Sequence, residues 1–250
     1  NGYIKEIKID DSYNPDGQLR NNIIQPKPLQ HITPTWGIRD ANWFADFPTS
    51  AKKILEFYRQ STGVQADGIL TLTPDIIIKI LEIIGPIEMP EYGLTLNSKN
   101  FLAQIQERVE STEGRESGEP KRVLVDFTPK FLDKVSASNE PDLLKILGVI
   151  TDSIKQKQIL VYFVDKDAEK IILNRNLGGD IKSSTGDYLQ VVISNVKGSK
   201  TDNVTDNSIK IDTRFEGGLS ESGGVKRIIH KLELTRQHNG GSNKYGFYNK

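Results

Sequence analysis

The residues best suited to chemistry lie in one ten-residue segment, from Arg39 to Pro48. The segment holds a guanidinium, an amide, two carboxylates and three aromatic rings, and it directly precedes a helical pattern. A loop at a helix N-terminus binds anions through an arginine and backbone N–H groups. Carboxylates such as Asp40 and Asp46 are ligands for a hard cation, Mg²⁺ or Ca²⁺. The segment therefore predicts a ligand site made of Arg39, Asp40, Asn42 and Asp46.

A structural interpretation of the same segment competes with the ligand site. In it, Asp46 caps the following helix, and Arg39 pairs with Asp40. Trp43 and Phe47 then anchor the loop on the core. Both interpretations stay open on the sequence alone.

Composition limits the classes of protein and of site. The 33 basic and 33 acidic residues give a formal charge of zero, so nothing favours nucleic acid as a partner. The absence of cysteine excludes disulfides, thiolate metal sites and a cysteine nucleophile. The three histidines match no zinc spacing, and His230 is expected to be a packed core residue. No G-x-S-x-G motif is present, so the sequence establishes no enzymatic activity.

Two other loops contain groups that bind ligands in other proteins. The segment Gly114 to Arg122 combines glycines with Arg115, Lys121 and Arg122, so it predicts either a phosphate contact or a solvated linker. The acidic segment Asp10 to Gly17 lacks the spaced oxygen ligands and the terminal glutamate of a calcium loop. We therefore expect a turn there.

Helical and strand patterns predict an α/β core domain over residues 1–180, with helices packed on a layered, βαβ-like sheet. The expected strands are Tyr3–Ile9, Asp67–Leu72 and Gln158–Val164. Proline and glycine signals place one helix between Pro48 and Gly63 and a second, largely apolar one between Thr73 and Gly85. Four further helices are expected: Asn97–Val109, Lys121–Val135, Pro141–Lys155 and Asp165–Leu173. The second has Pro129 inside it, so a kink or a restart is expected at Thr128.

Residues 181–250 change in character and predict an antiparallel β unit. Apolar residues alternate with polar ones at Leu189–Ile193, Ile209–Phe215 and Ile228–Leu234, and glycine-rich turns separate the last two runs. The aromatic tail, with Tyr245, Phe247 and Tyr248, is expected to begin another strand. The β unit is therefore predicted to be truncated at its C-terminal end.

Several of these segments resemble the bacterial domain-of-unknown-function family 4012. The resemblance rests on Arg39-Asp40-Ala41-Asn42-Trp43, Asp46 to Ala51, Asp67 to Pro74, Gly85 to Pro90 and Asn195 to Asp202. It implies an extracytoplasmic domain on the outer face of a bacterial cell membrane. The membrane anchor would be a segment absent from this chain, as would a glycine-rich strand that the family usually carries before Tyr3.

A more distant resemblance is to the LytR-CpsA-Psr family. It rests on the helix Thr49 to Ser61, the strand at Gly68, the isoleucine-rich helix and the Gly-Pro-Ile turn that follows. It implies magnesium-dependent transfer of a glycopolymer from a lipid-linked pyrophosphate carrier. In that interpretation Arg39 and Arg122 bind the diphosphate, and Asp40 and Asp46 hold the metal.

Two functions are therefore expected for this envelope protein. One is phosphoryl transfer from a lipid-linked carrier during assembly of a cell-wall glycopolymer. The other is a non-enzymatic binding or scaffold module at the cell surface. An apolar tunnel with arginines at its mouth would favour the first. A closed core, with an Arg39–Asp40 pair turned away from any cleft, would favour the second.

Overall fold

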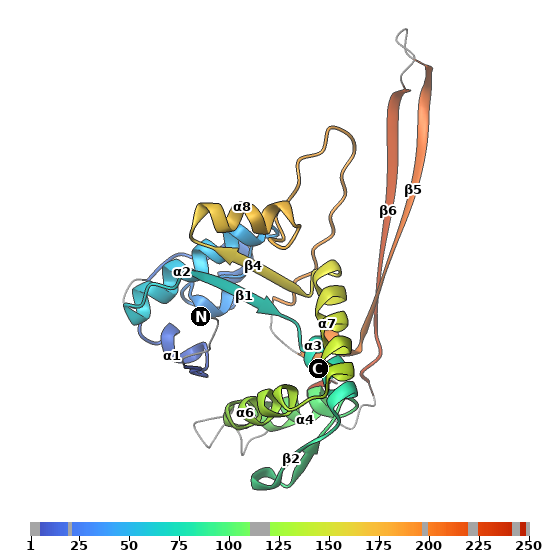
Figure 1. Ribbon diagram of the computed structural model, residues 1–250. Helices are drawn as coiled ribbons and strands as arrows, with labels where there is room; N and C mark the ends of the chain where they lie inside the picture. Colours follow the sequence, from blue (N-terminus) through green and yellow to red (C-terminus); the bar gives the residue numbers. More distant parts are fainter. Residues whose placement is uncertain are drawn as a thin grey trace. The chain divides into compact units, whose positions relative to one another are not determined.

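The computed structural model describes residues 6–19, 22–110, 121–196, 200–219, 225–241 and 246–248. It shows a mixed α/β chain with small antiparallel sheets (Figure 1). Contacts divide the chain into two compact units, Asn1–Val192 and Ile193–Lys250. The division into domains at residues 1–180 and 181–250 stays a prediction. No helix in the described ranges has the length and apolar character needed to cross a membrane.

The first unit begins with short elements: α1 (Tyr13–Asp16), η1 (Lys27–Leu29) and η2 (Ile38–Asp40). The strand predicted at Tyr3–Ile9 is wrong where the structure describes it, because residues 6–9 form no strand. Alternation needs a partner strand to become a sheet, and Ile7 is half exposed here. Residues 3–5 lie outside the described ranges. The predicted turn at Asp10 to Gly17 is confirmed and contains α1.

Helix α2 (Phe47–Thr62) forms where the sequence predicts it. Asp46 is its N-cap and accepts a hydrogen bond from the backbone N–H of Thr49. Gly63 ends it in the left-handed conformation, with φ at 74°. Phe47 and Ala51 are buried against Tyr162, so this helix covers the first sheet.

The first sheet pairs β1 (Gly68–Leu72) with β4 (Ile159–Phe163), in a register that runs from Gly68 opposite Phe163 to Leu72 opposite Ile159. The pairing is antiparallel, so the predicted βαβ-like layering is wrong. A βαβ unit needs two parallel strands, whereas here the chain crosses several helices and returns in the opposite direction. Helix α8 (Lys166–Asn174), capped by Asp165, follows β4.

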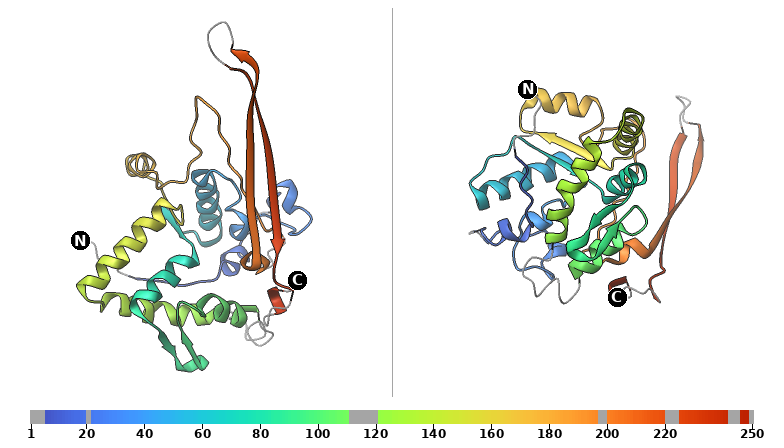
Figure 2. Two further views of the ribbon diagram at one scale, coloured as in Figure 1. Left: turned by 90° about the vertical axis from the view of Figure 1, so that its right-hand side faces the viewer. Right: turned by 60° about the horizontal axis from the view of Figure 1, so that its bottom comes forward.

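The largest apolar core lies between α3 (Pro74–Ile84), α4 (Phe101–Glu110), α6 (Arg122–Ser136) and α7 (Glu140–Lys155). Helices α3 and α7 lie side by side (Figure 1 and Figure 2). The hairpin of β2 (Ile87–Met89), η3 (Pro90–Tyr92) and β3 (Leu94–Leu96) closes this core. Helix α6 runs unbroken through Pro129, so the predicted restart is wrong. The Thr128 hydroxyl donates to the Leu124 carbonyl at 2.8 Å within it.

The second unit contains η4 (Lys200–Val204), β5 (Thr205–Leu219), β6 (Val225–His238) and η5 (Gly246–Tyr248). Strands β5 and β6 form a long antiparallel hairpin, which confirms two of the predicted strands. The strand predicted at Leu189–Ile193 is wrong, because this segment forms neither strand nor helix in the described structure. The predicted strand at Phe247 and Tyr248 is a 3₁₀ turn. His230 is exposed rather than packed in a core, and its Nδ1 lies 2.8 Å from the Thr213 hydroxyl.

Candidate functional site

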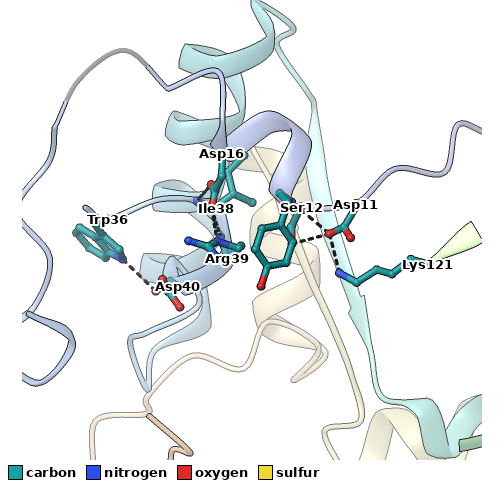
Figure 3. Close-up of polar contacts among 9 residues, drawn as sticks. Asp11, Ser12, Asp16, Trp36, Ile38, Arg39, Asp40 and Lys121 are labelled. Atoms are coloured by element: carbon teal, nitrogen blue, oxygen red, sulfur yellow. Dashed lines mark hydrogen bonds and ion pairs between the residues drawn. The ribbon is translucent and has the colours of Figure 1, made fainter. Parts of the chain in front are cut away.

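Asp16, at the end of α1, fixes the position of Arg39 (Figure 3). Its carboxylate accepts hydrogen bonds from the backbone N–H groups of Ile38 and Arg39, and from Arg39 Nε at 2.7 Å. Only 10% of the Asp16 side chain is exposed. Because the first N–H groups of a helical turn lack partners within the turn, the carboxylate satisfies donors of η2 that would otherwise be unpaired.

Gly37 allows this close approach. Its φ of −145° is ordinary extended backbone, so no residue type is excluded by conformation. A Cβ at position 37 would, however, lie 2.5 Å from the Asp16 carboxylate oxygen Oδ1. Any larger residue must therefore push the carboxylate away from η2.

Two cations lie near the ring of Tyr13. The Arg39 guanidinium carbon is 4.5 Å from the ring centroid, and Lys121 Nζ is 5.5 Å from it. Lys121 also bonds to Asp11 Oδ1 at 2.6 Å (Figure 3). Burial acts to lower the pKa of Arg39, but its bonds to Asp16 and Tyr13 outweigh this and leave the pKa above its ordinary value. Arg39 is therefore a permanent cation.

A cavity of about 240 Å³ lies beside Arg39. Trp36 forms a rigid part of its wall: the residue is 8% exposed, its Nε1 donates to the Asp40 carbonyl at 3.0 Å, and its ring meets the edge of Phe57 with centroids 5.4 Å apart. The residues lining the cavity include Tyr13, Asp16, Asn22, Thr35, Trp36 and Arg39. The cavity thus combines aromatic surface with hydrogen-bonding groups and one fixed guanidinium; we call it the Arg39 pocket.

Asp46 is engaged in holding the fold. One carboxylate oxygen accepts from the N–H and the hydroxyl of Thr49, and the other accepts from the Ile181 N–H at 3.1 Å. Burial acts to raise the pKa of Asp46, but these hydrogen bonds and the charge of Lys52 outweigh it and lower the pKa. Both oxygens are occupied, and the described residues contain no group of three metal-ligating side chains around them. Asp46 is thus engaged in the fold, and a Mg²⁺ site at Asp40 and Asp46 stays a prediction.

The structure separates the other predicted residues. Arg39 pairs with Asp16 rather than with Asp40, and Asn42 is exposed between η2 and α2. Arg122 is exposed at the start of α6 and bonds to Asp126 at 3.2 Å. Its neighbour Lys121 is the residue near the Tyr13 ring. Residues 114–120 lie outside the described ranges.

The sequence did not predict Asp16 or Tyr13 as part of this site, and it predicted Lys121 only as part of a phosphate contact or a solvated linker. Asp16 and Arg39 are 23 positions apart, and Lys121 and Asp11 are 110 apart. Local spacing carries no information on contacts over such distances. The only signal was the Asp16-Gly17 pair, which correctly indicated a turn.

The structure is thus a mixed α/β chain with a small, partly polar pocket beside Arg39. Residues 6–109, from the segment before α1 to the end of α4, match the family described as "Protein of unknown function (DUF4012)". This match confirms the predicted resemblance to that family over these residues, which include those that line the Arg39 pocket. No curated protein and no solved structure matches the chain.

Proposed function

We propose that this chain is a non-enzymatic binding module of the bacterial cell surface, whose Arg39 pocket takes an anionic unit of a cell-wall polymer. The observation that carries the proposal is the fixed guanidinium beside the pocket. A guanidinium has five N–H donors, and the bonds to Asp16 and Tyr13 use only part of them. A phosphate or carboxylate is the natural acceptor for the rest.

The size of the pocket supports a short polymer unit as ligand. Its volume of about 240 Å³ is below the roughly 300–1,000 Å³ of most small-molecule pockets. It suits one sugar or one phosphate-bearing unit, and it is too small for a polyprenyl chain. Asn22 and Thr35 supply hydrogen-bonding groups to such a unit, and Tyr13 and Trp36 supply aromatic surface to the lining.

Phosphoryl transfer from a lipid-linked carrier gains less support. That chemistry needs carboxylates able to hold a divalent cation beside the arginines. Asp46 is committed to the cap of α2 and to residue 181 instead. A LytR-CpsA-Psr-like fold stays a prediction. The extracytoplasmic location and the membrane anchor rest on the resemblance to the DUF4012 family.

Calorimetric titration of the full chain tests the proposal. The ligands are a glycerol-phosphate oligomer and an uncharged glycan oligomer of similar length. The wild type is expected to bind the anionic oligomer saturably. Arg39→Gln should weaken binding about tenfold or more, because the charge is lost while the amide can still donate to Asp16. Arg122→Gln is the matched control and should bind like the wild type.

Two results would overturn the proposal. One is unchanged affinity in a folded Arg39→Gln variant. The other is an equal loss in the Arg39→Gln and Arg122→Gln variants, which would show that the polymer responds only to total charge. Thermal unfolding of each variant verifies that the fold is intact.

A further inference from the structure

The hairpin of β5 and β6 is an exposed two-stranded ribbon. Every side chain from Asp206 to Glu216 on β5 is exposed, on both faces of the strand. The only sheet partner of β5 among the described residues is β6. An isolated two-stranded ribbon is marginally stable, and an open strand edge is a template for pairing with another chain. The outer edge of β5 is therefore a candidate interaction surface.

The charges on β5 follow a regular order. Lys210, Asp212, Arg214 and Glu216 occur at every second position, so they share one face of the strand. Their signs alternate. Residues at equal distances before and after Thr213 carry opposite charges. Asp212 and Arg214 form the inner pair of this symmetric pattern, and Lys210 and Glu216 form the outer pair.

This order makes β5 complementary to itself. If two copies of β5 pair antiparallel with Thr213 opposite Thr213, each of the four charges lies opposite a charge of the other sign. A register shift of two residues one way puts Asp212 against Asp212 and Lys210 against Arg214. The same shift the other way puts Arg214 against Arg214. The Thr213-centred register is thus favoured by charge, because it pairs all four charges, whereas a shift of four residues in either direction pairs only two of them.

The opposite face of the strand fits the same register. It carries Ile211 and Phe215, which are 46% and 66% exposed. In the Thr213-centred pairing, Ile211 of each copy lies opposite Phe215 of the other, which gives two apolar cross-strand pairs. The apolar faces of the two ribbons then lie on one side of the joint sheet, and their charged faces lie on the other side.

We infer that the β5 edge binds a second copy of this chain. The two hairpins form one four-stranded antiparallel sheet in the order β6, β5, β5 and β6, with a twofold axis at Thr213. This inference is independent of the Arg39 pocket. It rests on the open edge of β5 and on the charge order of that strand.

Cysteine cross-linking of the full chain tests the register. The chain has no cysteine of its own, so one introduced thiol can bridge only to a second copy. Directly opposite residues on antiparallel strands have Cα atoms about 4.5–5.5 Å apart, within the range of a disulfide. Thr213→Cys should therefore give a disulfide-linked dimer under mild oxidation.

Ile209→Cys is the matched control on the same face of β5. In the inferred register the two copies of position 209 are eight residues apart along the strands, about 27 Å, too far for a bridge. Thr213→Cys is expected to cross-link at least tenfold faster. Equal rates for the two variants, or no dimer from Thr213→Cys, would overturn the register.

Charge exchange tests the pairing without a covalent bond. In the inferred dimer, position 212 of each copy lies opposite position 214 of the other. Asp212→Arg therefore places two arginines opposite each other at both of these pairs, and Arg214→Asp places two aspartates there. Each variant alone should sediment as a monomer at concentrations where the wild type is a dimer. An equal mixture of the two should associate, because every pair is again of opposite charge.

Glu233→Lys is the control for effects on the hairpin itself. It alters a charge on the same face of the ribbon, but on β6, and should leave the dimer intact. Circular dichroism verifies the strand content of each variant. A monomeric wild type, single variants that associate like the wild type, or a mixture that stays monomeric would each contradict the inference.

Discussion

At the scale of single residues, the site depends on one carboxylate, that of Asp16, held against the backbone of η2. Gly37→Ala is expected to lower the free energy of unfolding by about 1–3 kcal/mol, because the added Cβ displaces this carboxylate from its donors. The measurement is urea-induced unfolding followed by tryptophan fluorescence.

A double-mutant cycle with Asp16→Ala separates this cause from others. In the Asp16→Ala background the alanine at position 37 has no carboxylate to displace, and its φ is unstrained. Its cost should then fall to about zero. A cost that stays the same in both backgrounds would refute the account of Gly37.

The contribution of Asp46 to the free energy of unfolding should decrease in acid. Its pKa in the folded protein is below the ordinary 3.8, so its contribution to stability is complete above that value and is lost as the pH falls through the folded pKa. Asp46→Ala should cost about 1–2 kcal/mol at neutral pH and clearly less in strong acid. Unfolding curves at the two pH values measure this.

Thr73→Ala is the matched control for Asp46→Ala. Thr73 occupies the N-cap of α3 without a side-chain cap bond, and its hydroxyl is buried without a hydrogen-bond partner. Its replacement should change stability by little at either pH. A loss equal to that of Asp46→Ala would show that cap position, and not the hydrogen bonds of Asp46, sets the cost.

At the scale of elements, the hydroxyl of Tyr92 ties η3 to α6 by donating to Asp126 at 2.6 Å. Burial and the charge of Asp126 raise the pKa of Tyr92 to about 12. The stabilisation is therefore complete below the ordinary pKa of 10.0 and disappears as the pH rises through about 12. Tyr92→Phe should cost about 0.5–1 kcal/mol below pH 10.

Alkaline titration of tyrosine absorbance measures the same group directly. The wild type should show a late ionisation near pH 12 that is missing in Tyr92→Phe. If the ionisation near pH 12 persists at the same amplitude in Tyr92→Phe, the Tyr92–Asp126 hydrogen bond is not its cause.

The elements with strong local signals could be predicted from the sequence. Asp46 and Gly63 bound α2, and Pro74 and Gly85 bound α3, because caps and breakers act on their own neighbours. Partners for strands could not be predicted. The runs at Leu189–Ile193 and Ile209–Phe215 alternate alike, yet among the residues that the structure describes only the second has a strand opposite it.

The site could be predicted only in part for the same reason. The segment Arg39 to Pro48 contains the arginine of the pocket and the cap of α2, and both roles follow from residue type. The partner of Arg39 is Asp16 rather than the adjacent Asp40, because the chain folds back to place α1 beside η2. Distant contacts of this kind leave no mark in local spacing.

At the scale of the whole molecule, the formal charge is zero, so two copies meet without net repulsion. Salt therefore acts mainly on the specific pairs of the inferred dimer. Those pairs are exposed, and screening should weaken association severalfold as ionic strength rises from about 0.05 to 0.5 M. Sedimentation equilibrium measures this change. Association that strengthens with salt would assign the contact to the apolar face rather than to the charged one.

Hydrogen exchange shows directly whether the Arg39 pocket binds an anionic polymer unit. The amides of the full chain are compared with and without the glycerol-phosphate oligomer. We expect slower exchange in the segments Tyr13–Gly17 and Thr35–Arg39, which contribute to the lining of the pocket, and no change in α6 around Arg122. Protection confined to α6, or none anywhere at saturating ligand, would contradict this expectation.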